Sequence, residues 1–566
     1  MLHCLLHLSI ADSPRRPNSL NLIHMVPLLR PLVALTASLV ASISFAERTH
    51  VTVLSTTDLH GHIHPVDYYT GEPAQRGLAK LGSLIKRARL LDPKLILVDS
   101  GDTIQGTPFA YHAAVVEPTN SNPMMAAMNA LKFDAMAPGN HEFNFGLEVL
   151  NTARRSSRFP WISGNVVLAS SEDPIYAPYI IKQVRGVRVG ILGLTTPSIP
   201  GWEDPDHYEG LEFTDPVEAA QRWVRELRRR SRVDVVVVAM HMGLEEDILS
   251  GQPIPGQLEG ENAAVRIARE VPGIDLILMG HTHREVPSIM INGVLLTQAG
   301  KWGEFLSRTT LMLERSDPTA PWEVIGKTAT THPITADVPT DPQILKITED
   351  AYAASEAWLD RAIGYSREAL SAARSRFEDT AIIDLIHQVQ LDAGDADVSL
   401  AVSFNPDARL PGGELTVRDI ASLYSFENTL VVVELTGEQL KEALEHSARY
   451  FLPAQPGAPI EALVDPRAYG YNFDMAEGVE YVIDLNQPLG ERITDLTYRN
   501  RPLDPKRKRK VAINNYRHNG VGGYTMFADA PVLSRSNVGI RELIIDWVRT
   551  NTDLPMQPSD NWSIKQ

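Results

Sequence analysis

The chain has 566 residues, more than one ordinary hydrophobic core accommodates, so the sequence predicts two or more domains. Its hydrophobic content of 43% and charged content of 22% are typical of a globular protein. The net charge of −17 argues against binding to duplex nucleic acid, whose phosphates an acidic surface repels, although a local metal site could still hold a small anion.

The N-terminal segment, residues 1–46, is predicted to be an export signal. After Met25 and one arginine comes an apolar run that leads to Ser44 and Ala46, which are placed like the −3 and −1 residues of a cleavage site. Residues 1–24 lack this pattern, so Met25 is a candidate for the true start. A membrane anchor or a buried helix is the alternative, but the run is short for a transmembrane span. We therefore expect a periplasmic or secreted protein that leaves the membrane after cleavage.

The only cysteine, Cys4, precedes that cleavage site. The mature chain would have no thiol, and so neither a disulfide nor a cysteine-bound metal. Any metal must then be bound by His, Asp, Glu or Asn.

Residues 47–335 alternate short apolar runs with amphipathic stretches. The stretches 77–91 and 215–230 are predicted helices. The apolar runs are rich in Val, Ile and Leu and are typical of strands buried on both faces: 51–56, 94–100, 133–137, 161–165, 187–194, 233–240 and 274–280. This part is therefore predicted to be a layered α/β domain.

A second α/β domain is predicted after a segment rich in Pro and Thr. Residues 336–363 are a predicted linker, most of it one long helix. Residues 364–552 then mix helical and strand patterns, and residues 553–566 are a predicted C-terminal tail.

Polar residues follow the ends of five predicted strands in the first domain. Each alone is more often a hydrogen-bonded loop or turn residue. In a layered α/β domain, however, strand ends gather ligands at one edge, and several of these residues have a neighbouring glycine that allows close backbone approach. The joint pattern predicts a metal site built from Asp58, His60, Asp102, Asn140, His241, His281 and His283.

Seven ligands are more than one tetrahedral site needs. They suit two cations that share a bridging carboxylate, for which Asp102 is the natural candidate. Two such cations can activate a water and neutralise the oxygens of a phosphoryl group. The mixed His, Asp and Asn set does not select among Zn, Mn, Fe, Co and Mg.

The motifs "DLHGH", "GDTIQGTP", "GNHEFNFG", "HMG" and "GHTH" together resemble the calcineurin-type metallophosphoesterases, and among them the exported 5′-nucleotidase family. "LYSFENTLVVVELTGEQLKEALE", "YNFDMAEGVEYVIDLNQP" and "NNYRHNGVGGY" resemble that family's C-terminal nucleoside-binding domain. The resemblance covers essentially all of the mature chain. It implies a four-layer metallophosphoesterase domain, a linker helix and a C-terminal substrate-binding domain.

The resemblance also implies roles for single residues. Asp58, His60, Asp102 and His283 would hold one metal, and Asp102, Asn140, His241 and His281 the other. His141 would contact the phosphate and assist the leaving oxygen. Phe426 and Tyr516 would stack on a nucleobase with Asn428 nearby, although a lone Phe or Tyr is more often a core residue.

Asn144 departs from the 5′-nucleotidase pattern, in which an aspartate lies three residues after the catalytic histidine. An amide oxygen could still accept a hydrogen bond from the His141 ring and fix its orientation. The residues around Asn144 look most like the 2′,3′-cyclic-nucleotide 2′-phosphodiesterase/3′-nucleotidase branch, which shares the asparagine. The family's substrate arginine has no clear counterpart, although Arg409 is nearby in sequence.

These patterns predict a two-metal hydrolase that opens 2′,3′-cyclic nucleotides and removes 3′-phosphates in extracytoplasmic nucleotide salvage, acting as a monomer. A 5′-nucleotidase or broad nucleotide phosphatase is the first alternative. An exported sulfur-compound hydrolase of the same superfamily would have little use for Phe426 and Tyr516, and a non-catalytic binding module should have lost metal ligands, none of which is missing.

Overall fold

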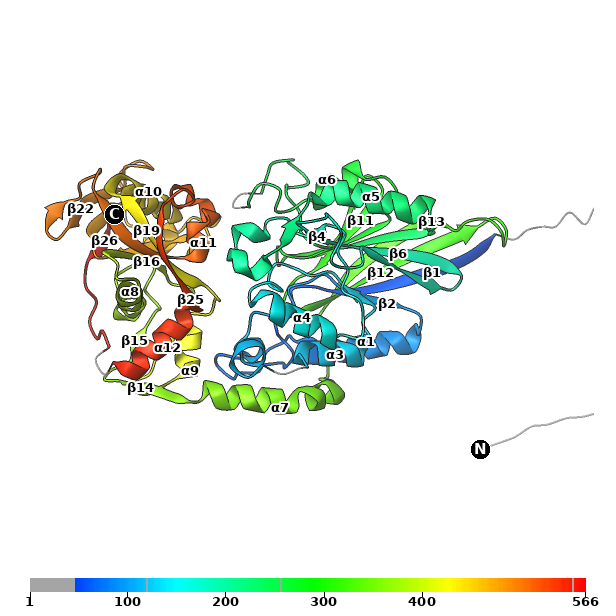
Figure 1. Cartoon of the computed structure of the whole chain (residues 1–566), viewed down its shortest axis with the longest axis horizontal. Helices are drawn as coiled ribbons and strands as arrows, with labels where there is room; N and C mark the ends of the chain where they lie inside the picture. Colours follow the sequence, from blue (N-terminus) through cyan, green and yellow to red (C-terminus); the bar gives the residue numbers. More distant parts are fainter. Residues whose placement is uncertain (1–45, 119–120, 255–256, 552–553) are drawn as a thin grey trace, which may run out of the picture.

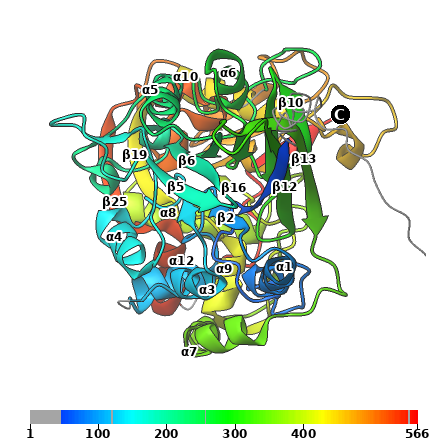
Figure 2. The ribbon, with the colours of Figure 1, turned by 90° about the vertical axis from the view of Figure 1, so that its right-hand side faces the viewer.

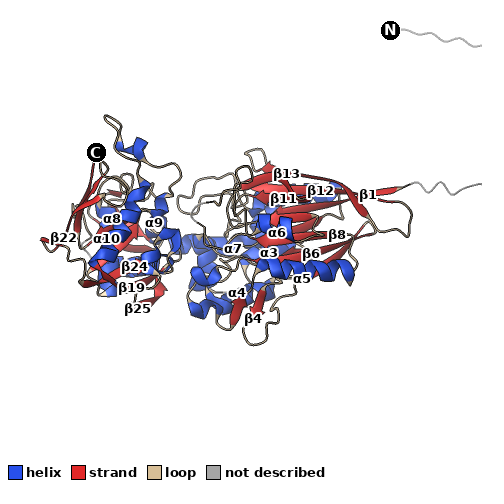
Figure 3. Ribbon diagram, turned by 90° about the horizontal axis from the view of Figure 1, so that it is seen from above, coloured by secondary structure: helices blue, strands red, loops and turns tan. Residues whose placement is uncertain are grey.

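The computed structural model describes residues 46–118, 121–254, 257–551 and 554–566. The predicted export signal, except for Ala46, lies outside the described residues, as does Cys4. Two bodies lie side by side, and helix α7 (Pro342–Leu359) runs from one to the other (Figures 1 and 3). None of the helices within the described ranges combines the length and the apolar character that a membrane crossing requires.

Two sheets form the centre of the first body. One has the strand order β13-β12-β1-β2-β3 and the other β10-β11-β9-β8-β6-β5. The strands of the first are β1 (Glu47–Thr56), β2 (Ile96–Asp99), β3 (Ala135–Met136), β12 (Phe305–Arg315) and β13 (Glu323–Pro333). Those of the second are β5 (Tyr179–Val184), β6 (Val187–Thr195), β8 (Val235–His241), β9 (Leu276–Met279), β10 (Glu285–Ile291) and β11 (Val294–Ala299).

Helices cover the outer face of each sheet. One apolar cluster, with Val53 and Val98 from the first sheet and Val189, Val237 and Leu278 from the second, fills the space between the sheets. In Figure 2, α1 (Leu78–Leu91) and α3 (Pro123–Leu131) lie below the sheets, and α5 (Pro216–Arg229) and α6 (Ala264–Glu270) lie above them. The four layers are those that the sequence predicted, because strands buried on both faces need an apolar partner on each side.

Two of the expected strands are shorter than their patterns suggested. The run 133–137 contributes only Ala135–Met136, and the run 161–165 makes isolated bridges at Trp161 and Ile162. After Ile162 the segment makes side-chain hydrogen bonds in place of strand pairing, since the Asn165 amide donates to the carbonyls of Thr195 and Thr214. The expectation of a strand at 161–165 was therefore wrong.

A mixed sheet with the order β20-β16-β24-β19-β25 carries the second body, and β23-β22-β21-β26 form a smaller sheet. The first has β16 (Val398–Val402), β19 (Thr429–Thr436), β20 (Asp474–Glu477), β24 (Lys508–Asn514) and β25 (Val532–Gly539). The second has β21 (Glu480–Asp484), β22 (Ile493–Tyr498), β23 (Arg501–Pro502) and β26 (Trp562–Lys565). β26 pairs in parallel with β21, so the end of the segment expected as a tail belongs to this sheet.

The helices of the second body are α8 (Ala381–Gly394), α9 (Val417–Leu423), α10 (Gly437–Ser447), α11 (Asn515–His518) and α12 (Ile540–Thr550). Tyr111 of the first body is buried in their core, where the Arg541 guanidinium lies 4.3 Å from the centre of its ring. On the linker helix, the Tyr352 ring stacks on His64 with the ring centres 3.9 Å apart. These contacts hold the second body and the linker helix against the first body.

Candidate active site

The candidate ligands lie at strand ends from both sheets of the first body. They follow β1, β2 and β3 in the first sheet, and they end β8 and follow β9 in the second. Groups of His and Asp ligand atoms at this edge lie within 4.8 Å of one another. The structure therefore brings together the strand ends that carry Asp58, His60, Asp102, Asn140, His141, His241, His281 and His283.

The backbone at this edge is strained. The residues with positive φ include Asp58 (52°), His60 (46°), Asp102 (57°), His281 (72°) and His283 (56°). A non-glycine residue in this region costs about 1–3 kcal/mol, and such residues cluster at functional sites. Packing around the strand ends holds these side chains in place against that cost.

Asp102 lies at the centre of the cluster and is buried. Its Oδ2 atom is 2.9 Å from His241 Nε2, 3.8 Å from His60 Nε2 and 4.0 Å from His141 Nε2. Burial alone would raise the pKa of the Asp102 carboxyl, but the charges of His241, His141 and His60 hold that pKa well below its usual range. A Cβ on Gly139 would collide with Asp102 Oδ1, which explains the glycine at that position.

A second group surrounds Asp58. His283 Nε2 is 3.5 Å from Asp58 Oδ1 and 3.0 Å from His60 Nε2. Burial, and then the charge of Asp102, raise the pKa of Asp58 well above its usual value. The buried carboxylates of Asp58 and Asp102 thus repel each other, and imidazole nitrogens lie close to both. Bound cations would remove this repulsion.

Asn140 provides an independent test of whether this donor set fits a metal. Its side-chain Oδ1 is buried and has no hydrogen-bond partner among the described residues. A buried amide oxygen without a partner is costly unless a cation or an ordered water satisfies it. Together with the clustered imidazoles and carboxylates, this oxygen makes the donor set one that fits divalent cations.

Hydrogen bonds behind the candidate ligands orient the imidazole rings. His60 Nδ1 is 3.1 Å from the Gln105 carbonyl oxygen, and His241 Nδ1 is 2.7 Å from that of Ser100. Since a carbonyl oxygen only accepts, each Nδ1 carries a proton, and in the neutral form of each ring, which burial favours, the Nε2 lone pair is left for a ligand. Contacts of this kind fix the tautomer of metal-binding histidines.

His281 is held differently from His60 and His241. Its Nε2 lies 2.8 Å from Glu261 Oε1, which leaves Nδ1 free to face the cluster. Glu261 was not predicted from the sequence, because it lies in a loop far from any strand end.

Glu142 is a second residue that the sequence interpretation missed. It is fully buried, and its carboxylate accepts the backbone N–H groups of Asp102, Thr103, Ile104 and Gly139. Burial and the nearby Asp102 charge raise its pKa to about 7. Glu142 thereby ties the loop after β2 to the loop after β3, and its position next to His141 was the available signal.

His141 lies at the open side of the cluster and is partly exposed. Its Nδ1 lies 2.5 Å from Asn144 Oδ1, and Asn144 Nδ2 donates to Glu203 Oε1 at 2.7 Å. Burial opposes a charge on His141, but Asp102, Asn144 and Glu203 favour the imidazolium and raise its pKa. The sequence predicted the contact between His141 and Asn144 but not Glu203.

The candidate base-binding residues lie in the second body. Phe426 is 44% exposed, and its ring centre is 4.7 Å from that of Phe404, which the sequence interpretation did not identify. Asn428 Nδ2 donates to Asn515 Oδ1 at 3.3 Å, so the Phe426 loop adjoins the segment of Tyr516. Burial raises the pKa of Tyr516 to about 12, with a smaller contribution from Glu261 of the first body. Tyr516 therefore lies near Glu261, the residue that contacts His281 at the strand-end cluster.

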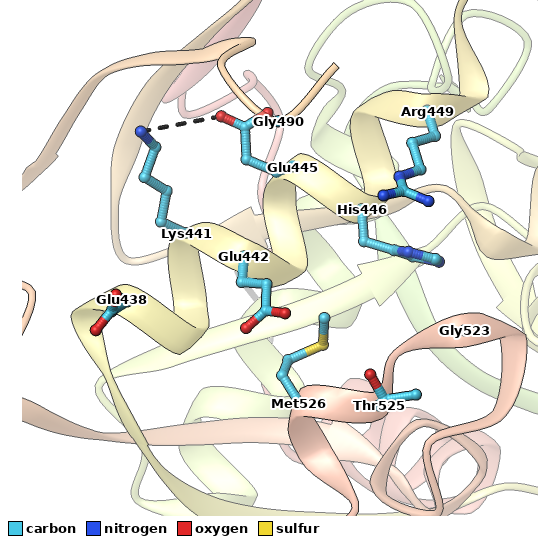
Figure 4. Close-up of a pocket in the computed structure, with 10 residues that line it drawn as sticks. All are labelled: Glu438, Lys441, Glu442, Glu445, His446, Arg449, Gly490, Gly523, Thr525 and Met526. Atoms are coloured by element: carbon cyan, nitrogen blue, oxygen red, sulfur yellow. Dashed lines mark ion pairs between the residues drawn. The ribbon is translucent and has the colours of Figure 1, made fainter.

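A separate open pocket lies along α10 and does not include any of these residues (Figure 4). Both acidic and basic groups line it, and Lys441 Nζ is 4.0 Å from Glu445. Glu445 in turn accepts the backbone N–H groups of Arg492 and Ile493. Lys441 and Glu445 thus already have partners, and we assign this pocket no function.

Comparison with protein families places this geometry in a class. Residues 51–285 match the calcineurin-like phosphoesterase model, and residues 362–529 match the model of the 5′-nucleotidase C-terminal domain. The fold and the strand-end cluster are thus those of a metallophosphoesterase, a class of enzymes that hydrolyse phosphoric esters.

Individual relatives refine the assignment. The chain is 30% identical to the 2′,3′-cyclic-nucleotide 2′-phosphodiesterase/3′-nucleotidase of Haemophilus influenzae, over 92% of the chain and 88% of that protein. It is 28% identical to the trifunctional nucleotide phosphoesterase protein YfkN of Bacillus subtilis over 97% of the chain, which corresponds to 41% of that longer protein. The chain belongs to the 5′-nucleotidase family, which confirms the resemblance seen in its motifs.

Solved structures show the same two-domain architecture. A candidate 5′-nucleotidase from Staphylococcus aureus superposes with a TM-score of 0.80 at 28% identity, covering 92% of this chain and 100% of that one. The 5′-nucleotidase precursor of Thermus thermophilus superposes with a TM-score of 0.65 at 24% identity, covering 92% and 100%, and shares the fold.

Proposed function

We propose that the protein hydrolyses nucleotide phosphoesters, as a 2′,3′-cyclic-nucleotide 2′-phosphodiesterase that also removes 3′-phosphates. The observation that carries the proposal is the position of Asp102 between two groups of imidazole ligands, at an edge near which Tyr516 of the second body lies. Relatives named for this activity support it.

Two divalent cations, of Zn, Mn, Fe, Co or Mg, are proposed as the cofactors. Their ligands would be Asp58, His60, Asp102 and His283 for one cation, and Asp102, Asn140, His241 and His281 for the other. When bound, such cations neutralise phosphoryl oxygens and acidify a water molecule.

His141 and Asn144 are the proposed catalytic residues. Asn144 Oδ1 accepts a hydrogen bond from Nδ1–H of His141, so Nε2 is the nitrogen that can hold or release a proton at the open side. The raised pKa of His141 favours the protonated ring, which can donate to the leaving oxygen as that oxygen gains charge.

The second body is proposed to bind the nucleoside. Phe426 and Tyr516 offer faces on which a base can stack, and Asn428 lies between their segments with a side chain able to hydrogen-bond. We infer that residues 47–335 form the catalytic domain, residues 336–363 the linker, and residues 364–552 together with β26 the substrate-binding domain.

The proposed setting is extracytoplasmic nucleotide salvage by a monomer that binds neither duplex nucleic acid nor membrane after export. The net charge of −17 and the N-terminal pattern of residues 1–46 support this part of the proposal.

A 5′-nucleotidase is the second candidate, and the Staphylococcus aureus structure named as a candidate 5′-nucleotidase favours it at 28% identity. Purified mature protein assayed in parallel on 2′,3′-cyclic AMP, 3′-AMP and 5′-AMP distinguishes the two. We expect kcat/KM to be highest for the first two substrates. A clear preference for 5′-AMP would establish the alternative, and no hydrolysis of any of the three would refute a nucleotide substrate.

A further inference from the structure

Glu203 lies behind the His141–Asn144 pair and is 5% exposed. One carboxylate oxygen, Oε1, accepts from Asn144 Nδ2 at 2.7 Å, and the other, Oε2, lies 3.0 Å from His207 Nδ1. The side chains of His207, Glu203, Asn144 and His141 thus form one continuous chain of hydrogen bonds. Glu203 is 59 residues from Asn144 in sequence, so only the fold brings them together.

The chemistry of the groups sets the direction of this chain. A carboxylate only accepts hydrogen bonds, whereas an amide accepts at its oxygen and donates at its nitrogen. Glu203 therefore requires Asn144 to point its nitrogen toward the carboxylate and its oxygen toward His141. With the amide reversed, two oxygens would face each other in a buried place, and His141 would face a donor.

The amide oxygen can only accept, so His141 carries a proton on Nδ1. The nitrogen left for chemistry is Nε2, which lies 4.0 Å from Asp102 at the open side of the cluster. Without Glu203, either face of the Asn144 amide could meet His141, and both ring tautomers would be populated.

The segment that carries Glu203 is fixed on both sides. The ring of Trp202 is 5.2 Å from that of His281, and its carbonyl oxygen accepts from Asn515 Nδ2 at 3.4 Å. Asp204 accepts from Thr429 Oγ1 at 3.1 Å in the second body. Glu203 is thus held in place by the metal-ligand edge and by the substrate-binding body.

We propose that Glu203 is a positioning residue, which orients the Asn144 amide so that its oxygen accepts from Nδ1–H of His141 and Nε2 stays available to the substrate. The proposal rests on the catalytic role proposed above for His141. The proposal also explains why residue 144 can be an asparagine. The carboxylate of this chain belongs to Glu203, which acts on the His141 ring through the Asn144 amide.

The proposal predicts that the effect of Asn144→Asp depends on Glu203. In the natural background the new carboxylate would meet Glu203 at the 2.7 Å now spanned by a hydrogen bond, and like charges at that distance repel. After Glu203→Gln, the glutamine amide can donate to the new aspartate, which then accepts directly from His141. The second substitution should therefore relieve the first.

The experiment compares the natural protein with Asn144→Asp, Glu203→Gln and the double variant, and uses Glu209→Gln on the same segment as an exposed control. Each protein is assayed on 3′-AMP and on bis-(p-nitrophenyl) phosphate. We expect Asn144→Asp to lower kcat on 3′-AMP by about tenfold or more, and the double variant to recover to within about threefold of the natural protein.

We expect Glu203→Gln alone to lower kcat for 3′-AMP more than for the nitrophenyl ester, whose leaving group needs little protonation. KM and metal content should be unchanged. An equal loss on both substrates would mean a purely structural role and overturn the proposal, as would an Asn144→Asp loss that is the same in both backgrounds.

Thermal unfolding of the chelator-treated proteins gives a readout that needs neither substrate nor metal. Tm should fall in Asn144→Asp and rise again in the double variant. If the natural protein hydrolyses no nucleotide but this coupling in Tm is present, the proposed substrate is wrong while Glu203 still positions Asn144. If the coupling is absent, the positioning role is wrong whatever the substrate.

Discussion

His241 Nε2 lies 2.9 Å from Asp102 Oδ2, and both side chains are almost completely buried. Two groups of potential ligand atoms share Asp102. One group also contains His60, and the other also contains His281. One carboxylate thus connects the two halves of the proposed metal centre.

Replacing Asp102 by alanine should therefore abolish more activity than any other single ligand substitution. Metal analysis of the purified Asp102→Ala protein should show loss at both sites, because a bridging carboxylate serves both cations. Asp58→Ala is the matched comparison, and it should lower the metal content by about one ion per chain. Two ions retained in Asp102→Ala, with near-normal turnover, would rule out a shared ligand.

The aromatic residues of the second body should affect nucleotides only. Stacking on one ring is worth about 1–3 kcal/mol, so Phe426→Ala or Tyr516→Ala should lower kcat/KM on 2′,3′-cyclic AMP by about five- to 150-fold. Hydrolysis of bis-(p-nitrophenyl) phosphate, which has no base, should change little. Tyr365→Ala, at a site 61% exposed, is the control. A parallel loss on both substrates would make these rings core residues.

The ion pair between Arg541 and Glu427 should matter for stability. The distance is 2.5 Å, and the side chains are 2% and 9% exposed. Arg541→Met would leave the Glu427 carboxylate buried without its partner, which costs about 3–5 kcal/mol in the free energy of unfolding. Adding Glu427→Gln should restore much of that loss.

The control for this pair is Arg374→Met, because Arg374 and its partner Glu461 are each about half exposed. Solvent screens such pairs, so they contribute little to the free energy of unfolding. Urea unfolding of the three variants measures the difference, and equal effects of Arg541→Met and Arg374→Met would contradict the account.

His387 should make the protein less stable in acid. Burial lowers the pKa of this histidine to about 3, whereas an unfolded histidine has a pKa near 6.5. The unfolded chain therefore binds the proton first, and the stability present above about pH 6.5 is lost as the pH falls toward 3. Between pH 7 and pH 5 this histidine should account for about 2 kcal/mol of lost unfolding free energy.

His387→Gln should remove that part of the pH dependence, and the exposed His332→Gln should leave it intact. Urea unfolding at a series of pH values measures both. The same pH dependence in His387→Gln as in the natural protein would show that the buried ring is not the titrating group.

The sequence predicted the parts of the fold that depend on local pattern. The run "TLVVVELT" is β19 (Thr429–Thr436) residue for residue, because its apolar side chains are buried whichever sheet receives them. The run 161–165 failed because Ser163 and Asn165 bond to other side chains and carbonyls, a choice that only the neighbouring strands impose.

Site residues were predictable where they follow strands. Asp58, Asp102 and His241 could be found because each ends an apolar run. Glu203 and Glu261 could not, since each lies in a loop and gains its role from a partner 59 or 20 residues away. The positive φ values of the ligands could not be read from the sequence either, because none of those residues is a glycine.

The most direct test of the central claim is a metal titration of chelator-treated protein, with hydrolysis of 2′,3′-cyclic AMP measured at each step. The account predicts no activity without metal and a rise that is complete only at about two equivalents per chain, because both ligand groups must be filled. Full activity at one equivalent, or activity that survives removal of all metal, would contradict it.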